Sequence, residues 1–163
     1  MKVICITGTP GTGKTALAKQ LAKKLNFFYL DVNRLISEKK ISEGYDSKRK
    51  SKIIDVKKLN KSIIKKLNEL KKQNIEGVII DSHLSHYLPK KYVSRCIVAK
   101  CDIKILNLRL KKRKYSKSKI KENLEAEIFG ICHEEAKEMK HKILLIDSSK
   151  GFNISKIAKI TGD

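Results

Sequence analysis

The stretch Gly8-Thr9-Pro10-Gly11-Thr12-Gly13-Lys14-Thr15 decides the fold of this 163-residue chain. It has the form G-x-x-x-x-G-K-[ST], which is the phosphate-binding P-loop. The glycines let the backbone curl so that successive N–H groups point inward and form a nest for phosphate oxygens. Lys14 can then reach the β- and γ-phosphates, and the Thr15 hydroxyl can ligate Mg²⁺. The positive N-terminal end of the helix that follows adds to the same field.

The segments on either side of this loop support the assignment. A P-loop requires an apolar strand before it and a helix after it, whereas a chance Gly-rich turn requires neither. Residues 3–6 (Val-Ile-Cys-Ile) are a β-branched run typical of a buried parallel strand. Residues 15–25 carry Leu and Ala at helical spacing, which predicts an amphipathic helix. Both conditions are met.

The rest of the chain alternates strand and helix patterns. Because such alternation is typical of a parallel sheet covered on both faces, we expect an α/β protein with the three-layer P-loop NTPase fold, a five-stranded sheet and a single domain over 1–163. The four further strands are expected at 26–32, 77–81, 93–99 and 143–147. The further helices are expected after Asp31, at 56–70 after an Asp55 cap, at 102–112, from Ser116 or Ser118 through Met139, and at 154–160.

Three finer expectations follow from the same patterns. In the helix over 102–112, Ile105, Leu106 and Leu108 should face inward. Asp31 is either a ligand-facing strand end or a helix cap, and its position before a short helix favours the cap. Residues 37–52 are polar and charged, and they predict a mobile insertion outside the core.

Polar residues that follow the predicted strands are the candidates for chemistry. Asp81 ends a β-branched strand, which is the Walker B pattern of a carboxylate that holds magnesium. A histidine in a loop is usually a surface residue, but His83 stands two positions after Asp81, and this favours a catalytic role. Arg109 and Arg113 share one helical face. They are either solvated charges or the cations that phosphoryl transfer needs around the moving group.

The composition is strongly basic. Against 17 Asp and Glu stand 38 Lys and Arg, a net charge of +21. Such an excess attracts polyanions, RNA first, but a Lys-rich composition also arises from genome bias or adaptation to heat, and both interpretations stay open. The four cysteines form no C-x-x-C pair, and no apolar run reaches the roughly 18 residues of a membrane span. We therefore expect reduced thiols in a soluble, cytoplasmic protein with no membrane partner.

The order of the segments narrows the class of enzyme. No N-K-x-D guanine-recognition sequence is present, which disfavours a signalling GTPase. A polar insertion after the second strand and a short Arg-bearing segment after the fourth are the layout of nucleoside monophosphate kinases. Their two lids close over acceptor and donor and exclude the water that would otherwise hydrolyse ATP.

The sequence resembles the adenylate kinase isoenzyme 6 family. The resemblance covers nearly the whole chain, and the segment that ends in Glu127-Ile128-Phe129 is far more specific than the P-loop. Besides the P-loop, it rests on Glu43-Gly44-Tyr45-Asp46, Asp81-Ser82-His83, Arg109-Leu110, Arg113-Lys114-Tyr115, Glu122-Asn123-Leu124-Glu125-Ala126-Glu127-Ile128-Phe129 and Glu134-Glu135-Ala136.

This resemblance implies an activity and partners. It implies Mg²⁺-dependent transfer of a phosphoryl group from ATP to AMP, together with an ATPase activity used in small ribosomal subunit maturation. The alternative is a nucleotide-switched assembly factor whose adenylate kinase activity is incidental. The implied partners are a ribosomal protein of the small-subunit platform and pre-ribosomal RNA. The monophosphate lid would span about 31–54, and a short ATP lid about 112–122.

The resemblance also implies roles for single residues. Lys14, Asp81, His83 and Arg113 would be catalytic, and Thr15 and Asp81 would hold the metal. ATP would contact Gly11, Gly13, Lys14, Thr15, Ala16, Arg109, Arg113 and Lys150, with Lys150 beside the adenine.

Two positions depart from the family pattern. Lys114 stands where the family usually has Gly. Ser37 stands where an Arg of the monophosphate lid is expected, and Arg34 or Arg49 would then have to supply that charge.

Overall fold

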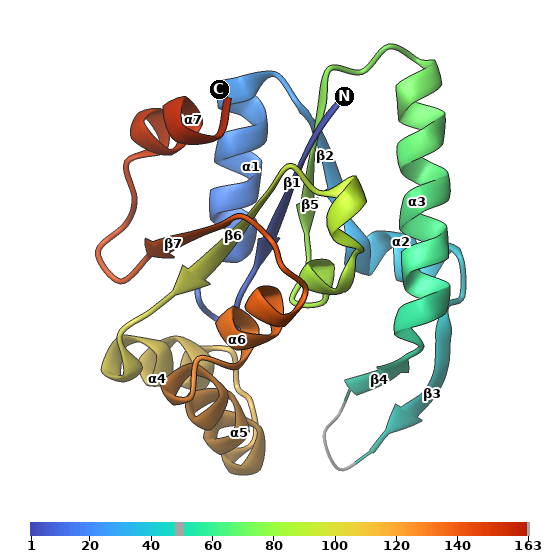
Figure 1. The fold of residues 1–163 in the computed structure, drawn as a ribbon. Coiled ribbons are helices and arrows are strands. Elements are labelled where there is room, and N and C mark those ends of the chain that lie inside the picture. Colours follow the sequence, from blue (N-terminus) through green and yellow to red (C-terminus); the bar gives the residue numbers. More distant parts are fainter. Residues whose placement is uncertain (48–50, 163) are drawn as a thin grey trace.

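The core of the protein is one parallel sheet of five strands (Figure 1). The computed structural model describes residues 1–47 and 51–162, with the backbone alone at 51 and 52. The strand order is β2-β5-β1-β6-β7, so the strand that leads into the P-loop lies in the centre. The strands are β1 (Lys2–Thr7), β2 (Phe28–Asp31), β5 (Gly77–Asp81), β6 (Arg95–Lys100) and β7 (Ile143–Asp147). The five-stranded parallel sheet predicted from the sequence is confirmed.

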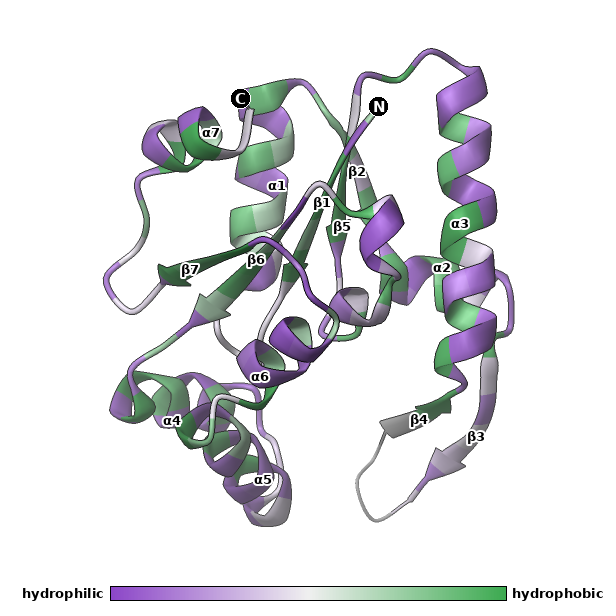
Figure 2. Cartoon of the chain, in the orientation of Figure 1, coloured by the Kyte–Doolittle hydropathy of each residue, from purple (hydrophilic) through white to green (hydrophobic). Residues whose placement is uncertain are grey.

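Alternate residues of the central strands enter two separate cores. In β1, Val3 and Cys5 face one core, while Ile4 and Ile6 face the other. This follows from the two-residue period of a strand, and burial on both faces explains why the strands read as unbroken apolar runs. In Figure 2 the strands of this sheet are predominantly hydrophobic in colour.

Helices cover both faces of the sheet. On one face lie α1 (Lys14–Leu25) and α7 (Ile154–Gly162), whose Leu17, Leu21 and Ile157 are buried. On the other lie α2 (Val32–Glu38), α3 (Val56–Lys72) and α6 (Ile131–Glu138). The short helices η1 (Ser85–Tyr87) and η2 (Lys90–Tyr92) lead from β5 to β6. Among the residues that the structure describes, no helix has the length and apolar character that crossing a bilayer requires.

Aspartates fix where several helices begin. The Asp55 carboxylate accepts hydrogen bonds from the N–H groups of Lys57 and Lys58 at 2.8 and 3.2 Å, as expected. Asp31 caps α2 and Asp102 caps α4 (Ile103–Lys112) in the same way. The favoured role of Asp31 as a cap is therefore confirmed. Replacing such a cap by Ala costs about 1 kcal/mol.

The helix expected to run from Ser116 through Met139 is in fact two helices. Ser116 caps α5 (Lys117–Ile128) by accepting from the Lys119 N–H, and α6 begins after Gly130. Gly130 has φ 62°, a left-handed conformation that interrupts the helix. The apolar period continues on both sides of the break, so periodicity alone predicted one helix.

One other expectation was wrong, and a second was incomplete because residues 37–52 contain regular structure and one core residue. Leu108 is 66% exposed, and the fully buried residues of α4 are Leu106 and Leu110. At about 100° per residue, Leu106 and Leu110 share a face and Leu108 lies on the opposite one. Within 37–52, the chain forms β3 (Ser42–Asp46), paired antiparallel with β4 (Ser51–Ile54), and Ile41 is buried in the core. Positions 48–50 of that insertion lie outside the described residues.

Candidate active site

The P-loop lies between β1 and α1 and has the backbone that its glycines predict. Gly8 has φ 137°, and a Cβ there would lie 2.4 Å from the Ala99 carbonyl oxygen, so no other residue fits. Gly13 has φ 85° and stands at the N-cap position of α1 without a side chain that caps the helix. The first N–H groups of α1 are therefore left to bind an anion such as phosphate.

Lys14 lies folded back over the loop. Its Nζ donates to the carbonyl oxygen of Thr9 at 3.0 Å, and the Thr12 hydroxyl donates to the same oxygen at 2.8 Å. Loss of water around the ammonium lowers the Lys14 pKa to about 8, although the nearby Asp81 carboxylate opposes that shift. The site therefore holds a cation that is only partly charged above pH 8 and that a polyphosphate would recharge.

Asp81 ends β5 at the same edge of the sheet. It is 5% exposed, and the Tyr29 hydroxyl donates to its Oδ2 at 2.9 Å. Burial and this bond to a carboxylate raise the pKa of Tyr29. Because Tyr29 engages Oδ2, the orientation of the carboxylate is fixed from the neighbouring strand β2.

His83 follows two residues later and lines the same cleft. The side chain is exposed at the cleft, although many protein atoms lie around the ring. This loss of water, together with the positive charge of Lys14, lowers the His83 pKa to about 4. His83 is therefore a neutral imidazole at pH 7, able to accept and donate hydrogen bonds to water.

One cleft of about 580 Å³ contains most of the residues predicted from the sequence. Its walls come from the P-loop and β5, from Asn33 of α2, and from the α4–α5 segment. The predicted site residues that it brings together are Gly11, Gly13, Lys14, Thr15, Ala16, Asp81, His83 and Arg113.

A second cavity of about 710 Å³ continues from the first. The two share Gly11, Gly13, Ala16 and Arg113. The second adds Arg109 and the loop after β7, through Ser148, Gly151 and Phe152. Lys150 does not line either cavity; it borders a smaller one of about 390 Å³ with Asp102 and Asp147. Its predicted place beside adenine stays a prediction.

Arg109 is held more tightly than a freely moving cation would be. Its Nη2 donates to the Ser148 carbonyl oxygen at 3.0 Å, and its Nη1 lies 3.4 Å from the Gly11 carbonyl oxygen. The Ser148 hydroxyl in turn lies within hydrogen-bond distance of the carbonyl oxygens of Thr12 and Lys100, which share its one proton. Arg109 and Ser148 thus tie the P-loop to the loop after β7.

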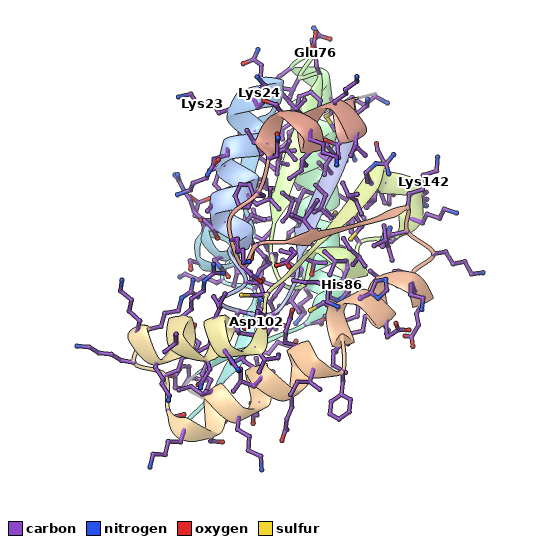
Figure 3. All side chains as sticks on the ribbon, turned by 90° about the vertical axis from the view of Figure 1, so that its left-hand side faces the viewer. Lys23, Lys24, Glu76, His86, Asp102 and Lys142 are labelled. Carbon is purple, nitrogen blue, oxygen red and sulfur yellow. The ribbon has the colours of Figure 1, made fainter. Side chains whose placement is uncertain are left out.

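Glu127 fastens the P-loop from another direction. It is 8% exposed, its Oε2 accepts from the Thr9 hydroxyl at 2.7 Å, and its Oε1 accepts from the Cys101 N–H at 2.9 Å. One carboxylate of α5 therefore joins the P-loop to the start of α4. In Figure 3, Asp102 marks that start of α4, at the opposite end of the sheet from Lys23 and Lys24.

Comparison with known proteins identifies the family to which the chain belongs. An adenylate kinase isoenzyme 6 homolog of Caenorhabditis elegans is 36% identical over 135 residues, which cover 83% of this chain and 72% of that protein. The chain belongs to the adenylate kinase isoenzyme 6 family. The Saccharomyces cerevisiae relative, adenylate kinase isoenzyme 6 homolog FAP7, is 33% identical over 96% of this chain and 79% of its own length.

Two further comparisons agree. A family model described as AAA domain matches residues 4–130. Shikimate kinase of Acinetobacter baumannii shares the fold, with a TM-score of 0.60 over 98% of this chain and 90% of that one, at 14% identity. This member of the adenylate kinase isoenzyme 6 family is therefore a phosphotransferase with a P-loop kinase fold.

Sequence reasoning missed several residues that shape the site of this family member. Tyr29, Ser148 and Glu127 hold Asp81 and the P-loop, yet each comes from an element distant in the chain. The sequence pointed to Glu127 in one way only, because Glu127 belongs to the segment 122–129 by which the family is recognised. From the α4–α5 segment, Tyr115, Lys119 and Asn123 also line the cleft.

Proposed function

We propose that this protein transfers the γ-phosphoryl group of ATP to AMP. The observation that carries the proposal is the single cleft that Asn33, from the proposed monophosphate lid (31–54), and Arg113 and Tyr115, from the proposed ATP lid (112–122), line together. The P-loop and Asp81 also line it. Such an arrangement supports two nucleotides that meet at the P-loop, because donor and acceptor phosphates must lie in line.

The reaction needs no covalent enzyme intermediate. A phosphate oxygen of AMP attacks the γ-phosphorus, the bond from that phosphorus to the β–γ bridging oxygen breaks, and two ADP molecules result. Lys14, Arg113 and the first N–H groups of α1 would stabilise the charge on the equatorial oxygens. The adenosine of ATP would lie in the second cavity, next to Arg109 and Phe152.

The oxygen donors at the cleft suit Mg²⁺. Thr15 offers a hydroxyl and Asp81 a carboxylate whose orientation Tyr29 fixes, and Mg²⁺ prefers such oxygen ligands. When bound with ATP, the ion would neutralise charge on the β- and γ-phosphate oxygens.

The decisive experiment measures ADP formation from MgATP with and without AMP. AMP should accelerate it strongly, and Lys14→Ala should lower the rate by at least about 100-fold, the typical loss when a preorganised charge-stabilising donor is removed. Lys23→Ala is the matched control, because Lys23 belongs to the same helix but lies at its far end (Figure 3). Full turnover by Lys14→Ala would end the proposal.

A second function is favoured by His83 and by the charge. A neutral His83 in the cleft can orient an attacking water, which suits a slow ATPase. The net charge of +21 fits a partner made of RNA. In this alternative the protein is a nucleotide-switched assembly factor for the small ribosomal subunit and binds a platform ribosomal protein. If AMP gives no acceleration and ribosomal-protein capture changes between ATP and ADP, the ATPase alternative replaces the kinase.

A further inference from the structure

A second cluster of reactive side chains lies between η1 and α6, outside the cleft. His86 comes from η1, and Cys132 and Glu135 come from α6. The ligand atoms of these three residues all lie within 4.8 Å of one another. Cys132 and Glu135 are three residues apart, so they lie on the same face of the helix. Figure 3 shows His86 close to the ribbon of α6.

The hydrogen bonds of His86 leave one ring nitrogen directed at this cluster. His86 is 1% exposed, and its Nδ1 lies 2.7 Å from the Thr7 hydroxyl oxygen. The Thr7 hydroxyl also lies 3.3 Å from the His83 carbonyl oxygen, and when it donates its one proton there, His86 Nδ1–H is the donor to Thr7. The Nε2 atom then carries a lone pair.

In that tautomer Nε2 has no proton to donate to Glu135. Nε2 lies 3.0 Å from Glu135 Oε2, but within the described part of the chain it has no partner in hydrogen-bond geometry. A ring lone pair that faces a carboxylate oxygen at this distance is unfavourable unless a proton or a metal cation lies between them.

We propose that His86, Cys132 and Glu135 form a site for a zinc-class divalent cation. Imidazole nitrogen, thiolate and carboxylate are the ligand types of Zn²⁺. Tetrahedral bonds of about 2.0 Å separate neighbouring nitrogen and oxygen ligands by about 3.3 Å, close to the 3.0 Å between Nε2 and Oε2. Mg²⁺ prefers oxygen ligands alone, so this site differs in chemistry from the one at Thr15 and Asp81.

The residues around the cluster orient its ligands. The Tyr87 hydroxyl donates to Glu135 Oε1 at 2.6 Å, which leaves Oε2 on the side of His86. Thr7 fixes the His86 ring in the same way from β1. Outer partners of this kind hold the ring and carboxylate ligands of metal sites in place. The Glu135 side chain is 31% exposed, so a water molecule can supply the fourth ligand.

Binding must release a proton from Cys132. Burial raises the pKa of the Cys132 thiol to about 11, while the nearby Lys14 opposes that shift. Because the thiolate is the ligand, the apparent affinity for the metal should rise with pH.

The test is a titration of the purified, metal-stripped full chain with Zn²⁺ in competition with a chromophoric chelator. One equivalent should bind, more tightly at pH 8 than at pH 6, and Cys132→Ser and Glu135→Gln should each weaken it at least tenfold. Co²⁺ should give a cobalt–thiolate absorption band that Cys132→Ser abolishes. At 100 times its dissociation constant, Zn²⁺ should raise Tm by roughly 5 °C or more.

Two controls separate this site from others. The first control is the double variant His133→Gln/Glu134→Gln. It removes a histidine and a glutamate of α6 that pair with each other and do not belong to the cluster, so it should bind Zn²⁺ normally. Asp81→Asn removes the proposed magnesium ligand and should also leave Zn²⁺ binding unchanged. Binding that survives both cluster variants, or that is lost in Asp81→Asn, would overturn the proposal. His86→Gln should weaken Zn²⁺ binding as well. If this variant fails to fold because His86 is buried, the variants at the partly exposed Cys132 and Glu135 still test the proposal.

Discussion

Lys14 couples nucleotide binding to a proton. In the free protein its pKa is lowered to about 8, and the phosphates of ATP should raise it again. At pH 8.5 ATP binding should therefore take up protons at Lys14, whereas at pH 7 Lys14 is already charged and contributes little uptake. Calorimetry in buffers of different ionisation enthalpy measures this uptake. Lys14→Gln should lose it, and buffer-independent heats at pH 8.5 in the unaltered protein would contradict the prediction.

Glu127 is the residue whose loss should most weaken the join between α5 and the P-loop. Glu127→Ala removes the acceptor for the buried Cys101 N–H and for the Thr9 hydroxyl. An unsatisfied buried donor costs about 1–3 kcal/mol, so the free energy of unfolding should fall by at least that amount. Urea denaturation measures it.

Glu125 provides the control for this variant. It lies two residues earlier on α5, is 51% exposed and, among the described residues, pairs with Lys121 at 3.8 Å. Such pairs contribute about 0.5 kcal/mol or less, so Glu125→Ala should be nearly neutral. Equal losses for the two variants would mean that helix propensity, and not the bonds of Glu127, sets the cost.

Among the elements, the segment from the end of α4 to the start of α5 should respond most to nucleotide. It carries Lys111, Lys112, Arg113, Lys114, Lys117 and Lys119, which repel one another until polyphosphate arrives. MgATP, more than AMP, should slow amide hydrogen exchange there, and Arg113→Ala should remove most of this protection without unfolding the protein. Exchange that is already slow in the free protein would show a fixed surface segment and not a lid.

The elements also show what the sequence could predict. Apolar runs such as Gly77–Asp81 identify a strand because each is buried on both faces. The helix break at Gly130 was not predicted, because a glycine in the left-handed conformation leaves the apolar period intact. The hairpin of β3 and β4 was not predicted, because its exposed residues, such as Glu43 and Tyr45, show no strand periodicity.

The same distinction between local patterns and long-range contacts applies to the site. Lys14, Thr15 and Asp81 were predictable because local spacing sets their chemistry, and the structure brings them into one cleft. Tyr29 was not, since its bond to Asp81 depends on β2 lying beside β5, and the two residues are 52 positions apart in the chain. Contacts across the sheet follow from strand order, which no local pattern contains.

At the scale of the whole molecule, the charge of +21 makes a separate prediction. If the surface serves RNA, binding to a small-subunit RNA fragment should be measurable at 150 mM salt, and log K should fall linearly with log[salt]. Filter binding at several salt concentrations measures the slope. Binding that appears only at low salt, together with a high Tm, would instead support adaptation to heat.

The bonds that hold the P-loop have a consequence for how the protein is made. The loop leaves the ribosome well before its anchors, which come 98, 118 and 136 positions later in the chain, at Arg109, Glu127 and Ser148. Domains generally fold as units during synthesis, and long-range contacts form late. We therefore expect a nascent chain to acquire ATP affinity only after the segment through Ser148 has emerged. Nucleotide binding would then report that every anchor of the P-loop has been synthesised.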